Sequence, residues 1–205
     1  MAEHQINTVT SSLLTLGNYQ ILCGTCASYT TVASAVSSCT TSLGAGMINS
    51  FGHTITRYDI QTGNSVDPIE GVAEENFTLS GDLIEWSAAA MTSAFGGIIT
   101  TGSSESAVTT IAAYSEITAG GATTVTPKCF VLKNLRHFTT SAGTAMSGYT
   151  YIVVWKATMT NGPQFTVKAD DDSDPIQTMA FELEGIIDGS RSTGDQLYRI
   201  QKWTY

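Results

Sequence analysis

Alternation of apolar and polar residues in the last third of the chain predicts a series of β-strands. The segment 151–155 (YIVVW) is apolar at every position, which is typical of a strand buried on both faces. Segments 164–169 and 178–187 alternate instead, so each should place one apolar face against a core. The turn signal Asn161-Gly-Pro joins the first two segments. We therefore expect a hairpin over 151–169, a strand at 178–187 and a last strand at 197–203.

Earlier segments predict more strands and one helix. Threonine-rich stretches at 53–60 and 108–117 are typical of strands, and we expect another strand at 125–132. Between them, Ile84, Ala88, Met91 and Phe95 recur with helical spacing, which predicts an amphipathic helix at about 82–95. The fold class is therefore mainly β, an antiparallel β-sandwich or barrel with one flanking α-helix and long loops or arms. We expect residues 1–205 to form a single domain.

A long uncharged segment precedes these strands. Between Glu3 and Arg57 the chain contains no Asp, Glu, Lys or Arg, and residues 26–52 show little periodicity. Loops of this length in a compact domain usually serve a function or become ordered against a partner. We therefore interpret the region of about 24–52 as an uncharged arm or loop that partners cover on assembly.

Charge narrows the possible functions further. Only 13% of the 205 residues are charged, which argues against coiled coils and long helical bundles. The net charge of −9 arises before residue 127, because residues 59–116 contain nine acids and no base, whereas the remainder is neutral. Binding nucleic acid through its phosphates requires a basic surface, and the chain has no overall excess of base. The acidity therefore argues against a protein that holds DNA.

Motifs for catalysis and cofactor binding are missing from the sequence. It contains no phosphate-binding Gly-Lys-Ser/Thr loop and no G-x-S-x-G elbow. Its lone C-x-x-C lacks the second pair that a zinc site needs, so we expect reduced, mostly buried thiols, with disulfide formation after release from a cell left open. The four cysteines are Cys23, Cys26, Cys39 and Cys129. We expect no enzyme activity, no cofactor, no metal, no signal peptide and no membrane-spanning segment.

Four consecutive segments of the last third carry a family resemblance. They are 151–158 (YIVVWKAT), 165–175 (FTVKADDDSDP), 179–184 (MAFELE) and 188–197 (DGSRSTGDQL). This succession of hairpin, acidic loop, closing strand and polar turn resembles the tail tube (major tail) proteins of long-tailed bacteriophages. The resemblance covers about a third of the chain, and its motifs are structural rather than catalytic.

The resemblance implies a structural virion protein, assembled in the host cytoplasm and located in the tail. Subunits of such proteins form six-membered rings that stack into a tube, and DNA passes through the channel during ejection. Implied partners are further copies of the chain, a tape measure protein in the channel, tail terminator and baseplate proteins and, in a contractile tail, a sheath. An acidic channel would repel DNA phosphates and let DNA slide without specific binding. The candidate channel-facing acids are Glu70, Glu74, Glu75, Asp82, Glu85, Glu182 and Glu184.

Other functions remain alternatives at this point. One is a different virion β-sandwich, such as a capsid decoration or head-tail connector protein. A second is a carbohydrate-binding adhesin module that uses the three tryptophans and eight tyrosines. A glycosidase with Glu182 and Glu184 as its carboxylate pair comes last, because neighbouring acids on one strand face are more often a solvated surface.

Overall fold

Ten strands and two helices make up the regular structure of the described residues. The computed structural model describes residues 19–60, 69–84, 87–96, 99–102, 116–121, 124–139, 145–167 and 177–204. The elements are β1 (Tyr19–Thr25), α1 (Val32–Ser38), β2 (Thr41–Ile60), β3 (Ile69–Leu83), α2 (Ala88–Ala94), β4 (Ile99–Gly102), β5 (Glu116–Ala119), β6 (Lys128–Thr139), β7 (Ala145–Met159), β8 (Gln164–Val167), β9 (Gln177–Gly185) and β10 (Tyr198–Thr204). The predicted fold class, a mainly β antiparallel barrel, is confirmed.

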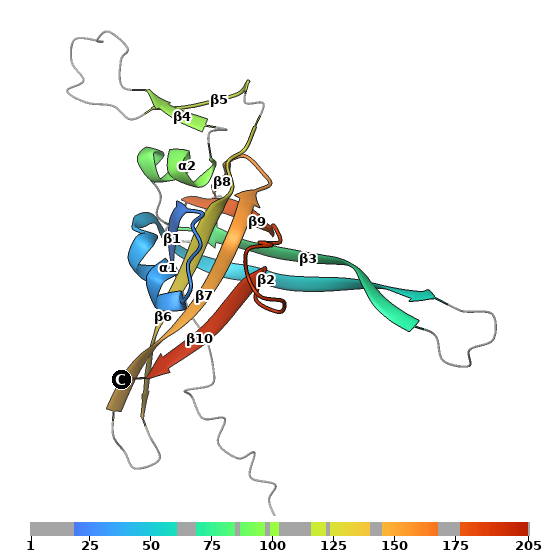
Figure 1. Cartoon of the computed structure of the whole chain (residues 1–205). Coiled ribbons are helices and arrows are strands. Elements are labelled where there is room, and N and C mark those ends of the chain that lie inside the picture. The colour runs from blue at the N-terminus through green and yellow to red at the C-terminus, as the bar shows by residue number, and fades with distance from the viewer. Residues whose placement is uncertain are drawn as a thin grey trace, which may run out of the picture.

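Eight strands form one antiparallel sheet that closes on itself (Figure 1). The strand order is β10-β7-β6-β1-β2-β3-β9-β8. Near its end β7 also pairs with β9, through Ala157 opposite Gly185 and Met159 opposite Leu183, so six strands complete a barrel. Strand β10 pairs with the first half of the same β7 edge, and β8 pairs with β9. Strands β4 and β5 form a separate small sheet.

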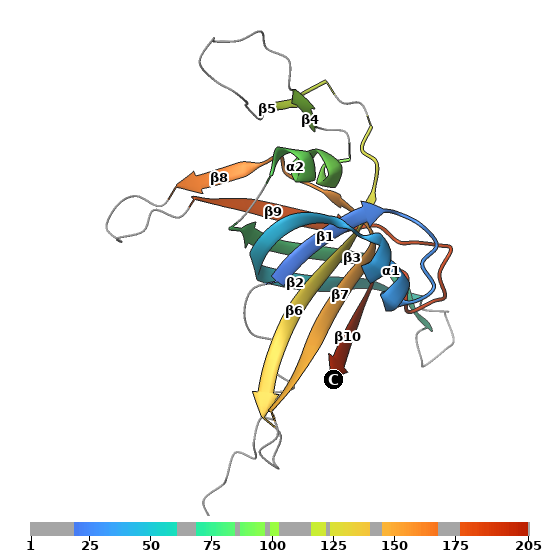
Figure 2. The ribbon, with the colours of Figure 1, turned by 90° about the vertical axis from the view of Figure 1, so that its left-hand side faces the viewer.

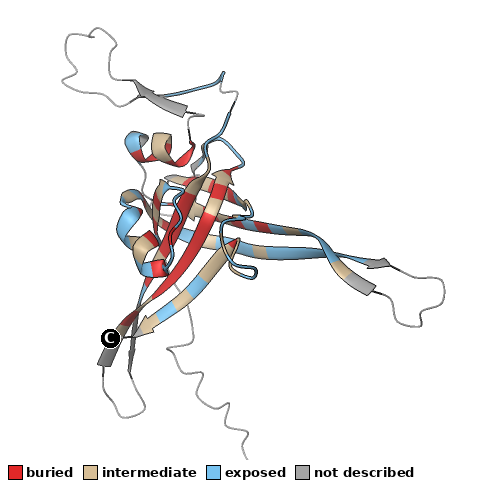
Figure 3. Ribbon diagram, viewed as in Figure 1, coloured by how far each residue is buried: buried red, intermediate tan, exposed pale blue. Residues whose placement is uncertain are grey.

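Alternate residues of the barrel strands point inward and fill its core, shown in red in Figure 3. On β3 these are Phe77, Leu79 and Leu83, and on β9 Met179, Phe181 and Leu183. Helix α2 adds Ala90, Met91, Ala94 and Phe95 to the same cluster. Because the strands alternate in this way, their other residues face outward.

Helix α1 covers part of the outer side of the barrel (Figure 2). It buries Val32 and Ala35 in a second cluster with Val131 of β6 and with Val153 and Trp155 of β7. Consequently β7 is buried on both faces, as its uninterrupted apolar run predicts.

Two expectations about helices and the arm are wrong. The helix expected at 82–95 is only α2, because Asp82 and Leu83 pair with β9 as the end of β3. Ser87 instead caps α2 by accepting a hydrogen bond from the backbone N–H of Ala90. Residues 24–52 are not a long loop, since they include α1 and half of β2 and bury Leu43 in the core. A helix of two turns rich in serine and alanine gives too weak an amphipathic pattern to be recognised.

Most predicted strands are confirmed. Segments 53–60, 151–155, 164–167, 178–185 and 198–203 lie in β2, β7, β8, β9 and β10, and β6 begins at Lys128 rather than at residue 125. The strand expected at 108–117 falls largely outside the described residues, as does the loop at 170–175.

Strands β2 and β3 continue beyond the barrel as a two-stranded ribbon (Figure 1). We define the ribbon as residues 54–60 of β2 and 69–76 of β3, which pair with each other and with no other strand that the structure describes. At about 3.3 Å per residue, it projects roughly 23 Å from the barrel wall. This projection is the largest departure from a rounded barrel shape.

Candidate functional site

The outer side of β3 and β9 brings three of the candidate acids together. Register places Thr78 opposite Glu184, Ser80 opposite Glu182 and Asp82 opposite Ala180. The residues between them point into the core, so these six side chains share one outward surface, which we call the β3–β9 face. Helix α1 lies over β6 and β7 instead, so this acidic surface is left uncovered by it.

Two asparagine side chains orient these carboxylates. Asn49 Nδ2 donates to Asp82 Oδ2 at 2.7 Å, and Asn161 Nδ2 donates to Glu182 Oε2 at 2.7 Å. Together with Gln164 they line a shallow hollow of about 230 Å³ that contains no Lys or Arg. Amide donors hold the carboxylates in place without neutralising them, so the face keeps its negative charge. Neither asparagine was predictable as part of this surface, because the pairing of β2 with β3 brings Asn49, and the turn after β7 brings Asn161, beside the acids.

The remaining candidate acids lie elsewhere. Glu74 points to the same side of β3 as Asp82, but it lies on the ribbon. Glu75 points to the opposite side, where its Oε2 lies 3.9 Å from Nε2 of His53. Glu70 lies opposite Asp59 in the strand register of the ribbon, and Glu85 lies outside the described residues. The seven candidates therefore do not form one cluster.

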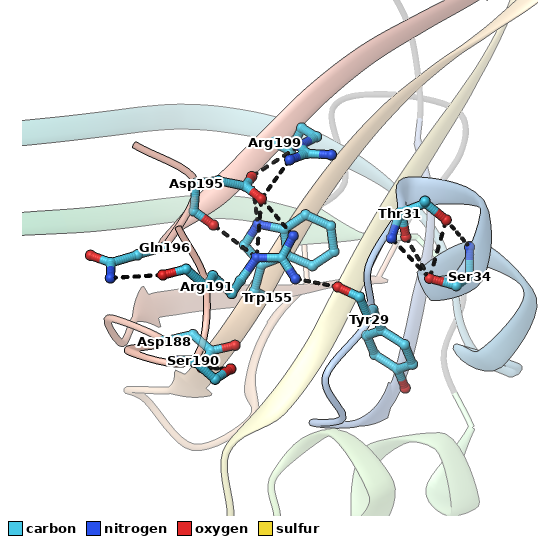
Figure 4. A network of polar contacts seen from close by, with 10 residues as sticks. All are labelled: Tyr29, Thr31, Ser34, Trp155, Asp188, Ser190, Arg191, Asp195, Gln196 and Arg199. Carbon is cyan, nitrogen blue, oxygen red and sulfur yellow. Dashed lines mark hydrogen bonds and ion pairs between the residues drawn. The ribbon is translucent and has the colours of Figure 1, made fainter. Parts of the chain in front are cut away.

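A partly buried ion-pair network fixes the loop between β9 and β10 (Figure 4). Asp195 Oδ2 accepts hydrogen bonds from Arg191 Nη2 and Arg199 Nη2, both at 2.5 Å. Its Oδ1 accepts from Arg199 Nε at 2.9 Å and from the indole N–H of Trp155 at 3.2 Å. The Arg191 guanidinium lies 3.4 Å from the centroid of the Trp155 ring and also donates to the carbonyl oxygen of Tyr29. The network thereby joins the loop between β9 and β10 to β7 and to the segment before α1.

Charge compensation in this network has a structural consequence. Burial alone would raise the pKa of Asp195, but the hydrogen bonds and positive charges of Arg191 and Arg199 outweigh it and lower the pKa. All three charged groups satisfy one another, so the network holds the loop and offers no free acid or base for catalysis. Arg191 and Asp195 belong to the segment that carries the family resemblance, but their pairing was not predictable, because a spacing of four residues brings side chains together in a helix and this segment is a loop.

All four cysteines lie in the part of the chain that the structure describes, and their surroundings favour the protonated thiol at Cys26 and Cys129. All four cysteines are free, and three are buried. Although Cys26 is exposed as a residue, its Sγ lies 3.7 Å from the Trp155 carbonyl oxygen, and desolvation raises its pKa to about 11. A hydrogen bond with Cys39, together with burial, raises the pKa of Cys129 far above its ordinary value. Thiolates, which are the reactive form, are therefore disfavoured at Cys26 and Cys129.

Over the described ranges, no group of three or more His, Cys, Asp or Glu side chains is placed to hold a metal ion. Neither α1 nor α2, the helices in that part of the chain, has the length and apolar character to cross a membrane. No protein-family model and no curated protein sequence matches the chain.

Proposed function

We propose that the protein is a tail tube subunit of a long-tailed bacteriophage. Copies of it form six-membered rings, the rings stack into a tube in the virion tail, and the β3–β9 face lines the channel that conducts DNA. The protein acts by assembly rather than by catalysis. The observation that carries the proposal is the ribbon, because its composition suits contact with another protein better than exposure to water.

The ribbon exposes three large apolar side chains. Ile55, Tyr58 and Val72 are each between 44% and 53% exposed. Completely burying side chains of this size contributes about 1.5–3 kcal/mol each. A two-stranded ribbon is also only marginally stable without further packing. An assembly that covers the ribbon therefore stabilises both its conformation and the contact between copies.

The ends of the large sheet support the same proposal. Strands β10 and β8 are its terminal strands, and each has one edge without a strand partner in the described part of the chain. Open edges favour pairing with strands of other chains. If neighbouring subunits pair there, the sheets join around a ring, and one surface of the joined sheet faces the channel.

The acidity of the β3–β9 face fits a channel for DNA. With three acids in each of six subunits, a ring would present about eighteen negative charges to the DNA phosphates. A wall of the same sign as its cargo lowers the residence time at any one place, whereas a basic wall would bind DNA tightly. This arrangement suits rapid transport better than storage.

Electron microscopy of the purified protein tests the proposal. Negatively stained hollow tubes with sixfold end views are the expected result. Monomers or trimers that bind phage capsids would contradict it and favour a decoration protein. Specific signals on a glycan array from unassembled protein would favour the adhesin alternative.

A further inference from the structure

A second surface of the barrel pairs aromatic side chains with positive charge. Strands β6, β7 and β10 lie side by side, with Lys133 opposite Tyr151 opposite Gln201, and Leu135 opposite Tyr149 opposite Trp203. We call these six residues the aromatic platform. Its members contact one another: Tyr151 and Trp203 have ring centroids 4.8 Å apart, and Lys133 Nζ lies 4.4 Å above the Tyr149 ring.

Part of the platform remains open to solvent. Tyr151 is buried by the cluster beneath α1, whereas Tyr149 and Trp203 are only partly buried and Leu135 is 48% exposed. Tyrosine and tryptophan side chains are enriched at protein contact surfaces, so these partly exposed rings beside an exposed leucine suit contact with another protein. The platform is therefore an extension of the second core cluster to the surface.

Charge distinguishes the platform strands from the ribbon. Strands β6, β7 and β10 contain six Lys or Arg residues and no Asp or Glu. By strand alternation, Lys133 and Arg199 lie on the platform side of these strands. Arg199 pairs with Asp195, and Lys133 supplies the positive charge of the platform. The ribbon has the opposite character, with four acids and the single base Arg57. Surfaces of opposite sign attract each other before contact and fix the orientation of the partner.

We propose that the ribbon of one copy docks on the aromatic platform of a second copy. The side of the ribbon that carries Ile55, Val72 and Glu75 supplies apolar side chains and an acid, which match the exposed leucine, the aromatic rings and Lys133 of the platform. Arg57, opposite Val72, lies on the same side, so the proposed charge contact is made by Glu75 itself. Within one chain the two surfaces do not meet, because the ribbon and the β6–β7 end leave the barrel in different directions (Figures 1 and 2).

The contact is head-to-tail, because each copy contributes a different surface. Such contacts repeat, and they produce closed rings or continuing stacks rather than symmetric dimers. The inferred contact rests on the proposed tube function, and it identifies the two surfaces through which copies in the tube touch. Because the contact between Glu75 and Lys133 is electrostatic, we expect added salt to weaken assembly.

A charge exchange tests the contact. Glu75→Lys and Lys133→Glu are made separately and together, and the concentration for half-maximal association is measured by sedimentation at low salt. We expect each single variant to raise this concentration about tenfold and the double variant to return to within about threefold of the unmodified protein. Glu116→Lys, on β5 outside both surfaces, makes the same change in net charge as Glu75→Lys and is its matched control. Circular dichroism and thermal unfolding check that every variant folds.

The outcomes separate this contact from the tube proposal. If single variants associate like the control, or if the double variant shows no recovery, the contact is wrong, and hollow tubes would still support the proposed function. If the exchange restores association but the particles are not hollow tubes, the contact is supported and the proposed function is contradicted. A wild-type protein that stays monomeric up to about 1 mM overturns both.

Discussion

Replacing Asp195 by asparagine should destabilise the fold strongly. The Asp195 side chain is only 13% exposed and neutralises Arg191, which is 7% exposed, and Arg199, which is 34% exposed. Removing one partner of a buried ion pair typically costs about 3–5 kcal/mol. Arg199 can turn to water, and Arg191 keeps its contacts with Tyr29 and Trp155, so we expect the lower end, about 3 kcal/mol. For a chain of this size, that corresponds to a fall in Tm of roughly 6–12 °C.

Urea unfolding followed by tryptophan fluorescence measures the effect, since Trp155 is part of the network. Asp188→Asn is a suitable control, because that carboxylate accepts hydrogen bonds from the backbone N–H and the hydroxyl of Ser190 and, among the residues drawn in Figure 4, pairs with neither arginine. Its loss should cost less than about 1 kcal/mol. A free energy of unfolding for Asp195→Asn within about 0.5 kcal/mol of the control would refute the reasoning.

The pH dependence of the free energy of unfolding provides a second test on the wild-type protein and Asp195→Asn. The pKa of Asp195 is lower in the folded state than in the unfolded state, where it is about 3.9. The charged carboxylate therefore contributes its full stability above the unfolded pKa and loses it as the pH falls through the folded pKa. The stability difference between wild type and Asp195→Asn should be constant from pH 7 to 5 and shrink below about pH 4. A difference independent of pH would show that the charge is unimportant.

Three further predictions concern other parts of the molecule. Gly81→Ala would place a Cβ 2.2 Å from the Met47 carbonyl oxygen, and in urea unfolding it should lower the free energy of unfolding by about 2 kcal/mol or more. Gly189→Ala, whose Cβ would have no atom within 4 Å, should leave that free energy nearly unchanged. Replacing both glutamates of the β3–β9 face by lysine should leave tubes that retain DNA in a salt-dependent filter-binding assay; unchanged DNA retention would contradict the channel assignment. Thiol labelling at Cys26 should be slow at pH 8 and accelerate about tenfold per pH unit up to its pKa of about 11, a profile that a fast, pH-independent reaction would disprove.

Strand positions were predictable because a half-buried strand imposes its own period on the sequence. Met179, Phe181 and Leu183 recur at every second position of β9, and all three are buried. Closure of the barrel has no such local signature, since it depends on β7 meeting β9 beyond the end of β10. Helix α2 was placed too early because Asp82 resembles a helix cap in sequence, whereas pairing with β9 decides its conformation. Tertiary contacts override local preference at that position.

The candidate site was predictable only within a single strand. Alternation alone places Glu182 and Glu184 on one face of β9. That Asp82 joins them depends on the register between β3 and β9, which couples residues a hundred positions apart. A shift of one residue turns a side chain to the opposite face, and for this reason Glu75 lies away from Glu74. Position along the chain therefore could not separate acids of the β3–β9 face from acids of the ribbon.

The pairing of β1 with β6 has a consequence for synthesis. Thr25 pairs with Lys128, so about a hundred further residues are translated after β1 before β6, its second neighbouring strand, has been synthesised. The hairpin of β2 and β3 emerges early, but the strands that carry the aromatic platform are translated near the end of the chain. Contacts between distant segments also form slowly. Under the proposed head-to-tail contact, a nascent chain presents its ribbon before its own platform has been translated. It can therefore dock on the platform of a finished copy. It cannot accept the ribbon of a further copy until translation is nearly complete.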